Sequence, residues 1–217
     1  MAIATYTDLF RAGMEYLARD NDVTLGNRFP DFITLFEAKA NRVLTHPMME
    51  VRSITDVDTS AAEPEFITLP LDFQAMRRIR LSSVTGKPVL KFLSQTQIES
   101  YRYSRDNTTG RPCFYSIVGN ELELAPTPNE NFTLEMVYRA NIPPLSASAG
   151  TNWLLSLAPD LYLYGSLLEA APYLKDDARI PVWAAAVESC IDQLNTHGHR
   201  QNVDPGPSTI SLPGPTP

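Results

Sequence analysis

The sequence predicts an α+β protein: a four-helix bundle formed by the N- and C-terminal helices, an inserted small antiparallel β domain and an extended C-terminal tail. Apolar residues recur at helical spacing near both ends of the chain, whereas short runs of alternating or β-branched residues fill its middle. Five of the 18 prolines follow residue 204. We therefore expect a discontinuous helical domain at 1–49 and 151–199, a β domain at 50–150 and a Pro-rich tail at 200–217.

Two amphipathic helices are expected in the first third of the chain. Thr5 or Thr7 can cap a helix that continues to about Arg19. Pro30 suits the first position of a second helix, which reaches about His46. Apolar residues in this second segment follow the i, i+3, i+4, i+7 spacing of a helix with one buried face.

The middle of the chain changes to the period of β-strands. Gly119 and Asn120 separate two of its runs and form a typical two-residue hairpin turn. Ser94 can cap one short helix, because the residues that follow it show no strand alternation. The expected strands, separated by turn signals, are EFITLP, MRRIRLS, KPVLKFL, CFYSIVG, ELELAP and FTLEMVYR.

Helices return at Pro159. Apolar residues surround most of the segment that follows, which predicts a helix buried on several sides until Pro172 kinks or ends it. A last amphipathic helix is expected from about Ala178 to Asn195, and Gly198 is suited to stop it.

Length and composition exclude several classes of protein. A chain of 217 residues can bury a sizeable core without a covalent staple. Cys113 and Cys190 are too few for a disulfide scaffold or a four-thiolate zinc site, so we expect two half-buried thiols in a reducing compartment. No apolar stretch approaches the roughly 18 residues that cross a bilayer, and we expect neither a secretory signal nor membrane contact.

We find no motif for catalysis, cofactor binding or metal binding. The sequence has no G-x-S-x-G, Walker lysine loop or G-x-G-x-x-G. His197 and His199 could supply two metal ligands, but no further ligand follows at a useful spacing, so we expect surface histidines. Glu169 stands alone in an apolar helix and is expected to form an ion pair with a neighbouring helix or chain. We assign no catalytic, cofactor or metal residues.

The net charge of −7 is unevenly distributed. Residues 77–111 hold eight basic and two acidic residues, a balance of +6, which leaves −13 on the rest of the chain. Alternation along a strand places Arg78 and Arg80 on one face and Arg77 on the other with Ile79. Mixed arginine and tyrosine side chains are typical of protein interfaces, and they can also stack on nucleic-acid bases. We favour an interface between neighbouring copies, with these residues in it: Arg77, Arg78, Arg80, Tyr101, Arg102, Tyr103 and Arg105.

The tail is too rich in proline, glycine and serine to bury enough apolar surface to order itself. Ile210 and Leu212 are its only large apolar residues after Val203. We expect the tail to be extended, to contact other chains and to be anchored by these two residues.

Four segments then carry a resemblance to a known family: ITLPLDF (67–73), GRPCFYSIVGNELELAPTP (110–128), TNWLL (151–155) and PDLYLYGSLLEAAPYLKDDARIPVW (159–183). They resemble the head-to-tail adaptor, or connector, proteins of tailed bacteriophages with short tails. Periodicity does not explain Asn152 and Trp153, and we expect a capped turn with Trp153 in a pocket beside the kinked helix.

The resemblance implies a structural, non-enzymatic protein of the virion neck, assembled in the host cytoplasm. It implies a ring, commonly of twelve copies, that binds the portal protein, extends the DNA channel and offers a docking surface for the tail nozzle or fibre proteins. DNA would pass through the ring during ejection without specific binding. Two alternatives stay open: a tail-associated, carboxylate-based hydrolase, and a nucleic-acid-binding module that uses residues 77–111.

Overall fold

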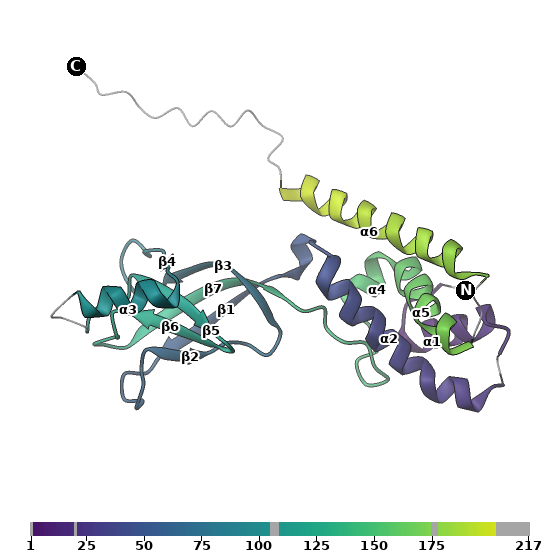
Figure 1. Ribbon diagram of the computed structural model, residues 1–217, viewed down its shortest axis with the longest axis horizontal. Coiled ribbons are helices and arrows are strands. Elements are labelled where there is room, and N and C mark those ends of the chain that lie inside the picture. Colours follow the sequence, from purple (N-terminus) through teal and green to yellow (C-terminus); the bar gives the residue numbers. More distant parts are fainter. Residues whose placement is uncertain (1, 20, 105–108, 175–177, 203–217) are drawn as a thin grey trace, which may run out of the picture. The chain divides into compact units, whose positions relative to one another are not determined.

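The protein forms two compact units (Figure 1). The computed structural model describes residues 2–19, 21–104, 109–174 and 178–202. A helical unit contains the chain up to Met48 and again from Ile142, and a β unit contains Met49–Asn141. The predicted α+β class is confirmed. Residues 142–150, which we expected in the β domain, lie in the helical unit, where Leu145 donates its backbone N–H to Glu37.

Five α-helices make up the described part of the helical unit. The central one is α5, which packs against each of the other four. Apolar residues are buried on several sides of α5. Pro172 lies in its last turn, and the helix ends two residues later, at Leu174. The helices are α1 (Tyr6–Tyr16), α2 (Val23–Val43), α4 (Trp153–Leu157), α5 (Pro159–Leu174) and α6 (Ile180–Asn202), with a short 3-10 turn, η1 (Pro47–Met49), after α2.

The N-terminal capping of α1 is confirmed, whereas the expected start of α2 is wrong. Thr5 caps α1 and exchanges hydrogen bonds with Asp8. Helix α2 begins at Val23 because the side chain of Asp22 accepts the N–H of Leu25. Pro30 therefore lies inside the helix, whose buried apolar face extends to both sides of it.

The expected stop at Gly198 is also wrong, because this glycine serves close packing. Helix α6 continues to Asn202, so residues 200–202, which we expected in the extended tail, are helical instead. Gly198 is buried, and a Cβ atom there would lie 2.7 Å from Cδ of Pro47 and 2.9 Å from Cδ2 of His46. Glycine at this position lets α6 approach the segment that directly follows α2.

A second close approach leads to a prediction about stability. A Cβ atom at Gly165 would lie 2.1 Å from Cδ2 of Phe36, so Gly165→Ala overpacks the interface of α5 and α2. We expect a loss of about 1–3 kcal/mol in the free energy of unfolding, measured in denaturant. Gly26→Ala is the matched control in α2, because its Cβ would be 3.5 Å from Phe10 and alanine favours helices by about 1 kcal/mol. Equal shifts in the two variants would contradict this packing argument.

The β unit consists of two sheets. One is antiparallel, in the order β1-β7-β3; the other has the order β2-β6-β5-β4, with β4 parallel to β5. Inward-facing apolar residues of both sheets form one core. The elements are β1 (Glu50–Val57), β2 (Phe66–Thr68), β3 (Phe73–Leu81), β4 (Lys91–Phe92), α3 (Gln95–Tyr103), β5 (Phe114–Val118), β6 (Glu121–Ala125) and β7 (Phe132–Ala140).

Local signals predicted most of these elements. Gly119 and Asn120 join β5 to β6 as expected, with Gly119 at a φ of 60°. Ser94 is the N-cap residue of α3, and its N–H donates to the side chain of Gln97. Strand β1 was not predicted. Its core side carries Ser53 and Thr55, which hide the alternation of apolar and polar residues.

Candidate functional site

The outer face of the sheet β1-β7-β3 collects arginines from all three strands. Alternate residues of β7 enter the core, so Glu135 and Arg139 point to the other side. The register aligns Ile54 of β1 and Arg80 of β3 with Glu135. We call this surface the arginine face; its arginines are Arg52, Arg77, Arg78, Arg80 and Arg139.

A β-bulge adds Arg77 to this face. The pairing of β3 with β7 shifts by one residue between Met76 and Arg78. The Nε atom of Arg77 consequently lies 3.4 Å from Oε1 of Glu50, an outward-facing residue of β1. The alternation that placed Arg77 on the opposite face with Ile79 is therefore wrong at Arg77, since a bulge turns two successive side chains to one side. Ile79 does enter the core.

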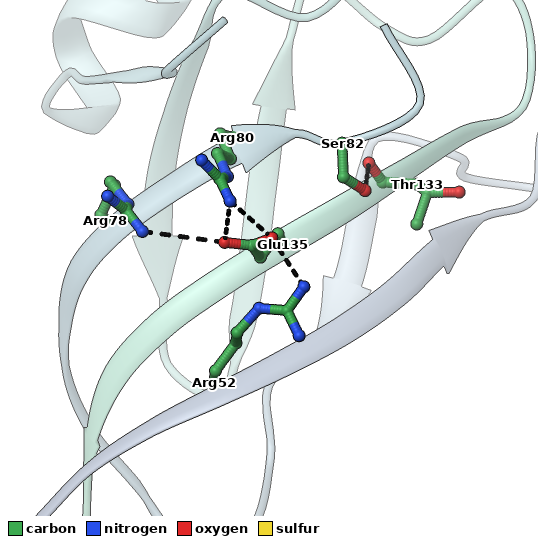
Figure 2. A network of polar contacts seen from close by, with 6 residues as sticks. All are labelled: Arg52, Arg78, Arg80, Ser82, Thr133 and Glu135. Atoms are coloured by element: carbon green, nitrogen blue, oxygen red, sulfur yellow. Dashed lines mark hydrogen bonds and ion pairs between the residues drawn. The ribbon is translucent and has the colours of Figure 1, made fainter. Parts of the chain in front are cut away.

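Glu135 organises the centre of the face (Figure 2). Its Oε2 accepts Nη2 of Arg52 at 2.8 Å, and its two oxygens accept Nη2 of Arg80 at 2.7 and 2.9 Å. Arg78 lies further away, with Nη2 3.7 Å from Oε1. The Glu135 side chain is only 2% exposed. Hydrogen bonds from Arg52 and then Arg80 lower the pKa of Glu135 to about 2, so the carboxylate is charged at neutral pH.

The face keeps unused hydrogen-bonding capacity toward the outside. About half of each side chain of Arg52, Arg77 and Arg78 is exposed, at 58%, 53% and 49%. A guanidinium carries five N–H donors, and the ion pairs given above use only some of them. The five arginines and the three carboxylates of Glu50, Asp56 and Glu135 give the face a net charge of +2. This surface can bind carboxylates or phosphates.

Polar contacts close one end of the face. The hydroxyl of Ser82 donates to the carbonyl oxygen of Thr133 at 3.0 Å (Figure 2). The Thr133 hydroxyl in turn donates to Oδ1 of Asp56 at 2.8 Å. These bonds hold the ends of β3, β7 and β1 together beside the arginines.

The remaining predicted interface residues do not lie on the arginine face. Tyr101, Arg102 and Tyr103 lie on α3, which packs on β5 of the other sheet. Arg102 forms an ion pair with Glu123 at 3.1 Å, Tyr101 packs edge-on against Phe114, and Tyr103 is 95% exposed. Arg105, Ile210 and Leu212 lie outside the described residues.

The other candidate residues have structural partners. Glu169 pairs with Lys39 of α2 at 2.7 Å, which confirms the ion pair expected with a neighbouring helix. The thiol of Cys190 donates to Asp160 at 3.2 Å, and burial raises its pKa to about 11. Cys113 is exposed just before β5, not half-buried as expected.

Histidines 197 and 199 are exposed, as predicted. Across the part of the chain that the structure describes, no group of three histidine, cysteine or acidic side chains could hold a metal ion. Among the same residues, no helix is both long and apolar enough to cross a membrane.

Asn152 connects the helices through a buried network. As predicted, it caps a helix, because its Oδ1 accepts the N–H of Leu155 at 2.8 Å. Its Nδ2 donates to the carbonyl of Pro143 at 2.7 Å and to the hydroxyl of Tyr162 at 2.6 Å. The Tyr162 hydroxyl donates to Oε1 of Glu37 at 2.9 Å. Burial raises the pKa of Glu37, since the described residues give it hydrogen-bond donors but no cation.

Trp153, at the start of α4, stacks on His46, which in turn stacks on His197. The ring of His46 is buried and lies 5.6 Å from Trp153 and 5.8 Å from His197, centroid to centroid. Nε2 of His46 is 3.5 Å from Nδ1 of His197, and the N–H of Met48 donates to Nδ1 of His46. Burial and then the charge of His197 lower the pKa of His46. Sequence spacing gave no signal of this stack, because His46 lies more than 100 residues from both Trp153 and His197.

Comparison with known proteins agrees with the motifs that resemble phage adaptors. The model of the family described as SU10 adaptor protein matches residues 4–211. No curated protein matches the chain. Since the matched range covers both described units, the chain belongs to the SU10 adaptor protein family, a family of phage head-to-tail adaptors.

Proposed function

We propose that the protein is a structural component of a short-tailed phage virion, where a ring of copies joins the portal to the tail and extends the DNA channel. The family match over residues 4–211 carries this proposal. Membership in an adaptor family places the protein among virion components that meet portal and tail proteins. The ring, its twelve copies and the channel are parts of the proposal.

Each part of the chain has a role in this arrangement. Helices α1, α2, α5 and α6 act as a four-helix bundle that forms the body of the ring. The β unit meets the tail nozzle or fibre proteins. The segment 203–217 is the strap that holds the portal or a neighbouring copy, with Ile210 and Leu212 as its anchors.

The charges favour DNA passage over DNA binding. Four of the predicted basic residues already have carboxylate partners within the protein: Arg77, Arg78, Arg80 and Arg102. Each contact between a free cation and a phosphate adds affinity and slows sliding. A lumen of paired and acidic side chains would let DNA move during ejection.

The role requires no catalysis. Glu169, which stands alone among apolar residues in its helix, forms an ion pair with Lys39. We expect no hydrolysis of cell-wall substrate by the protein, and no change in Glu169→Gln or Asp160→Asn variants. Hydrolysis that these substitutions abolish would establish the tail-associated hydrolase instead.

Mass measurement of the full chain mixed with the portal protein tests the proposed function. We expect a complex that contains several copies of this chain on each portal ring. A chain that stays monomeric and does not bind the portal would overturn the proposal.

Deletion of residues 204–217 tests the strap separately. We expect the truncated chain to keep the thermal unfolding midpoint of the full chain, because the described core lies within residues 2–202. Its assembly with the portal should weaken, since the segment contributes binding energy only in the complex. Ile210→Ser with Leu212→Ser in the full chain should give the same loss. A truncated chain that unfolds counts against this role.

A further inference from the structure

The arginine face has no covering element within the described β unit. The core of this unit lies on the inner side of β1, β3 and β7, and the outer side exposes Ile54 beside the arginines. Glu135 fixes two guanidinium groups at 2.7–2.9 Å before any partner binds. A partner therefore meets a largely preorganised cationic surface, which reduces the entropy lost on binding.

Helix α6 offers the opposite charge on a face that is also uncovered in its unit. Glu188 and Asp192 are exposed one turn apart, and within the described residues neither carboxylate belongs to an ion pair. Like charges at positions i and i+4 repel each other and destabilise a helix. This pair therefore costs stability in the isolated chain, and an external cation would remove that cost.

A groove that Asp192 helps to line adds a third carboxylate. It has a volume of about 590 Å³ and runs between α6 and the start of α5. Asp160 and Asp192 line it together with apolar Leu157 and Leu194, whereas Arg200 is its one lining arginine. We call Asp160, Glu188 and Asp192 the acidic ridge.

We propose that the arginine face of one copy docks on the acidic ridge of a second copy. This inference rests on the proposed ring, since it names the contact that joins its subunits. The two surfaces differ, so the contact is heterologous. A pair of copies that makes one such contact still has one free arginine face and one free acidic ridge. Such contacts repeat from copy to copy and close into a ring when the rotation permits.

Charge balance favours a protein partner over a nucleic acid. The face has a surplus of only +2, and the chain as a whole carries −7, which would repel a phosphate backbone. Carboxylates match the planar fork of arginine in pairs of hydrogen bonds. The exposed side chain of Ile54, at 54%, can pack against an apolar groove wall such as that of Leu157, but it gains nothing from phosphates.

Charge reversal of each surface tests the contact in the full chain. Arg77→Glu with Arg78→Glu reverses the arginine face and leaves the close bonds of Arg52 and Arg80 to Glu135 intact. Glu188→Arg with Asp192→Arg reverses the ridge. We expect each double variant to weaken self-association by about 10- to 100-fold, measured by sedimentation with and without portal. Lys91→Glu with Arg111→Glu is the control, because it makes the same charge change elsewhere on the β unit.

Mixing the two reversed proteins gives the decisive result. An equimolar mixture should recover association, because every reversed face then meets an oppositely charged ridge on the other variant. The proposal is overturned if the mixture stays as weakly associated as its components while wild-type chains still assemble on the portal. It is also overturned if reversal of the arginine face abolishes salt-sensitive DNA binding and leaves association unchanged. Loss of portal binding by the wild-type chain would instead refute the proposed function itself.

Discussion

Replacement of Glu135 by glutamine is expected to destabilise the β unit strongly. Glutamine removes the carboxylate that lies between Arg52 and Arg80 and leaves their guanidinium charges facing each other at the centre of the sheet. Breaking a buried, hydrogen-bonded ion network from one side leaves uncompensated charge. The denaturant midpoint of Glu135→Gln should fall well below that of Glu121→Gln, the same change at an exposed position of the same unit.

The stabilisation of the folded protein by Glu135 depends on pH. The pKa of Glu135 is about 2 in the folded protein and ordinarily 4.5. A lowered pKa means that the folded state binds the proton less readily than the unfolded state, so the stabilisation is complete above pH 4.5. It declines as the pH falls from 4.5 to about 2. We expect Glu135→Gln to lack this part of the acid dependence, and an unchanged acid profile would contradict the assignment.

Tyr162→Phe is the second substitution with a large expected effect. It deletes the hydroxyl that joins Glu37 to Asn152 inside the helical unit. Among the described residues, Glu37 then keeps only the N–H of Leu145 as a donor, and an amide N–H of Asn152 loses its acceptor. Buried polar groups left without partners cost about 1–3 kcal/mol each, and charged groups cost more. We expect a loss of about 3 kcal/mol in the free energy of unfolding.

Tyr164→Phe provides the matched control on the same helix. Its side chain is half-buried, and its hydroxyl has no hydrogen bond within the described residues. The loss in this variant should be small, below about 0.5 kcal/mol. Similar losses in the two variants would show that the aromatic packing, and not the hydroxyl network, carries the stability.

Local patterns predicted the elements better than the contacts between them. The apolar period of α2 and the turn at Gly119 depend on neighbouring residues, so they were recognisable in the sequence. The interior position of Pro30 was not, because the cap at Asp22 outweighs the usual preference of proline for a helix start. The buried position of Gly198 depends on His46, 152 residues earlier.

The candidate site shows the same division. The basic segment was evident from composition, and three of its arginines do share one face. Their organising carboxylate was not predictable, since Glu135 reads as an ordinary outward residue of an alternating strand. Arg52 and Glu135 meet only through the pairing of β1 with β7. The bulge at Arg77 also has no sequence signature, because it arises from a one-residue mismatch between paired strands.

The insertion of the β unit into the helical unit sets an order of events during synthesis. Helices α1 and α2 make their main contacts with α5, which starts at Pro159. By contrast, β7, the central strand of its sheet, ends at Ala140, so the β unit is complete while α5 is still inside the ribosome. Domains fold as units as they emerge. The two leading helices must therefore wait, with apolar faces exposed, through the synthesis of about a hundred further residues.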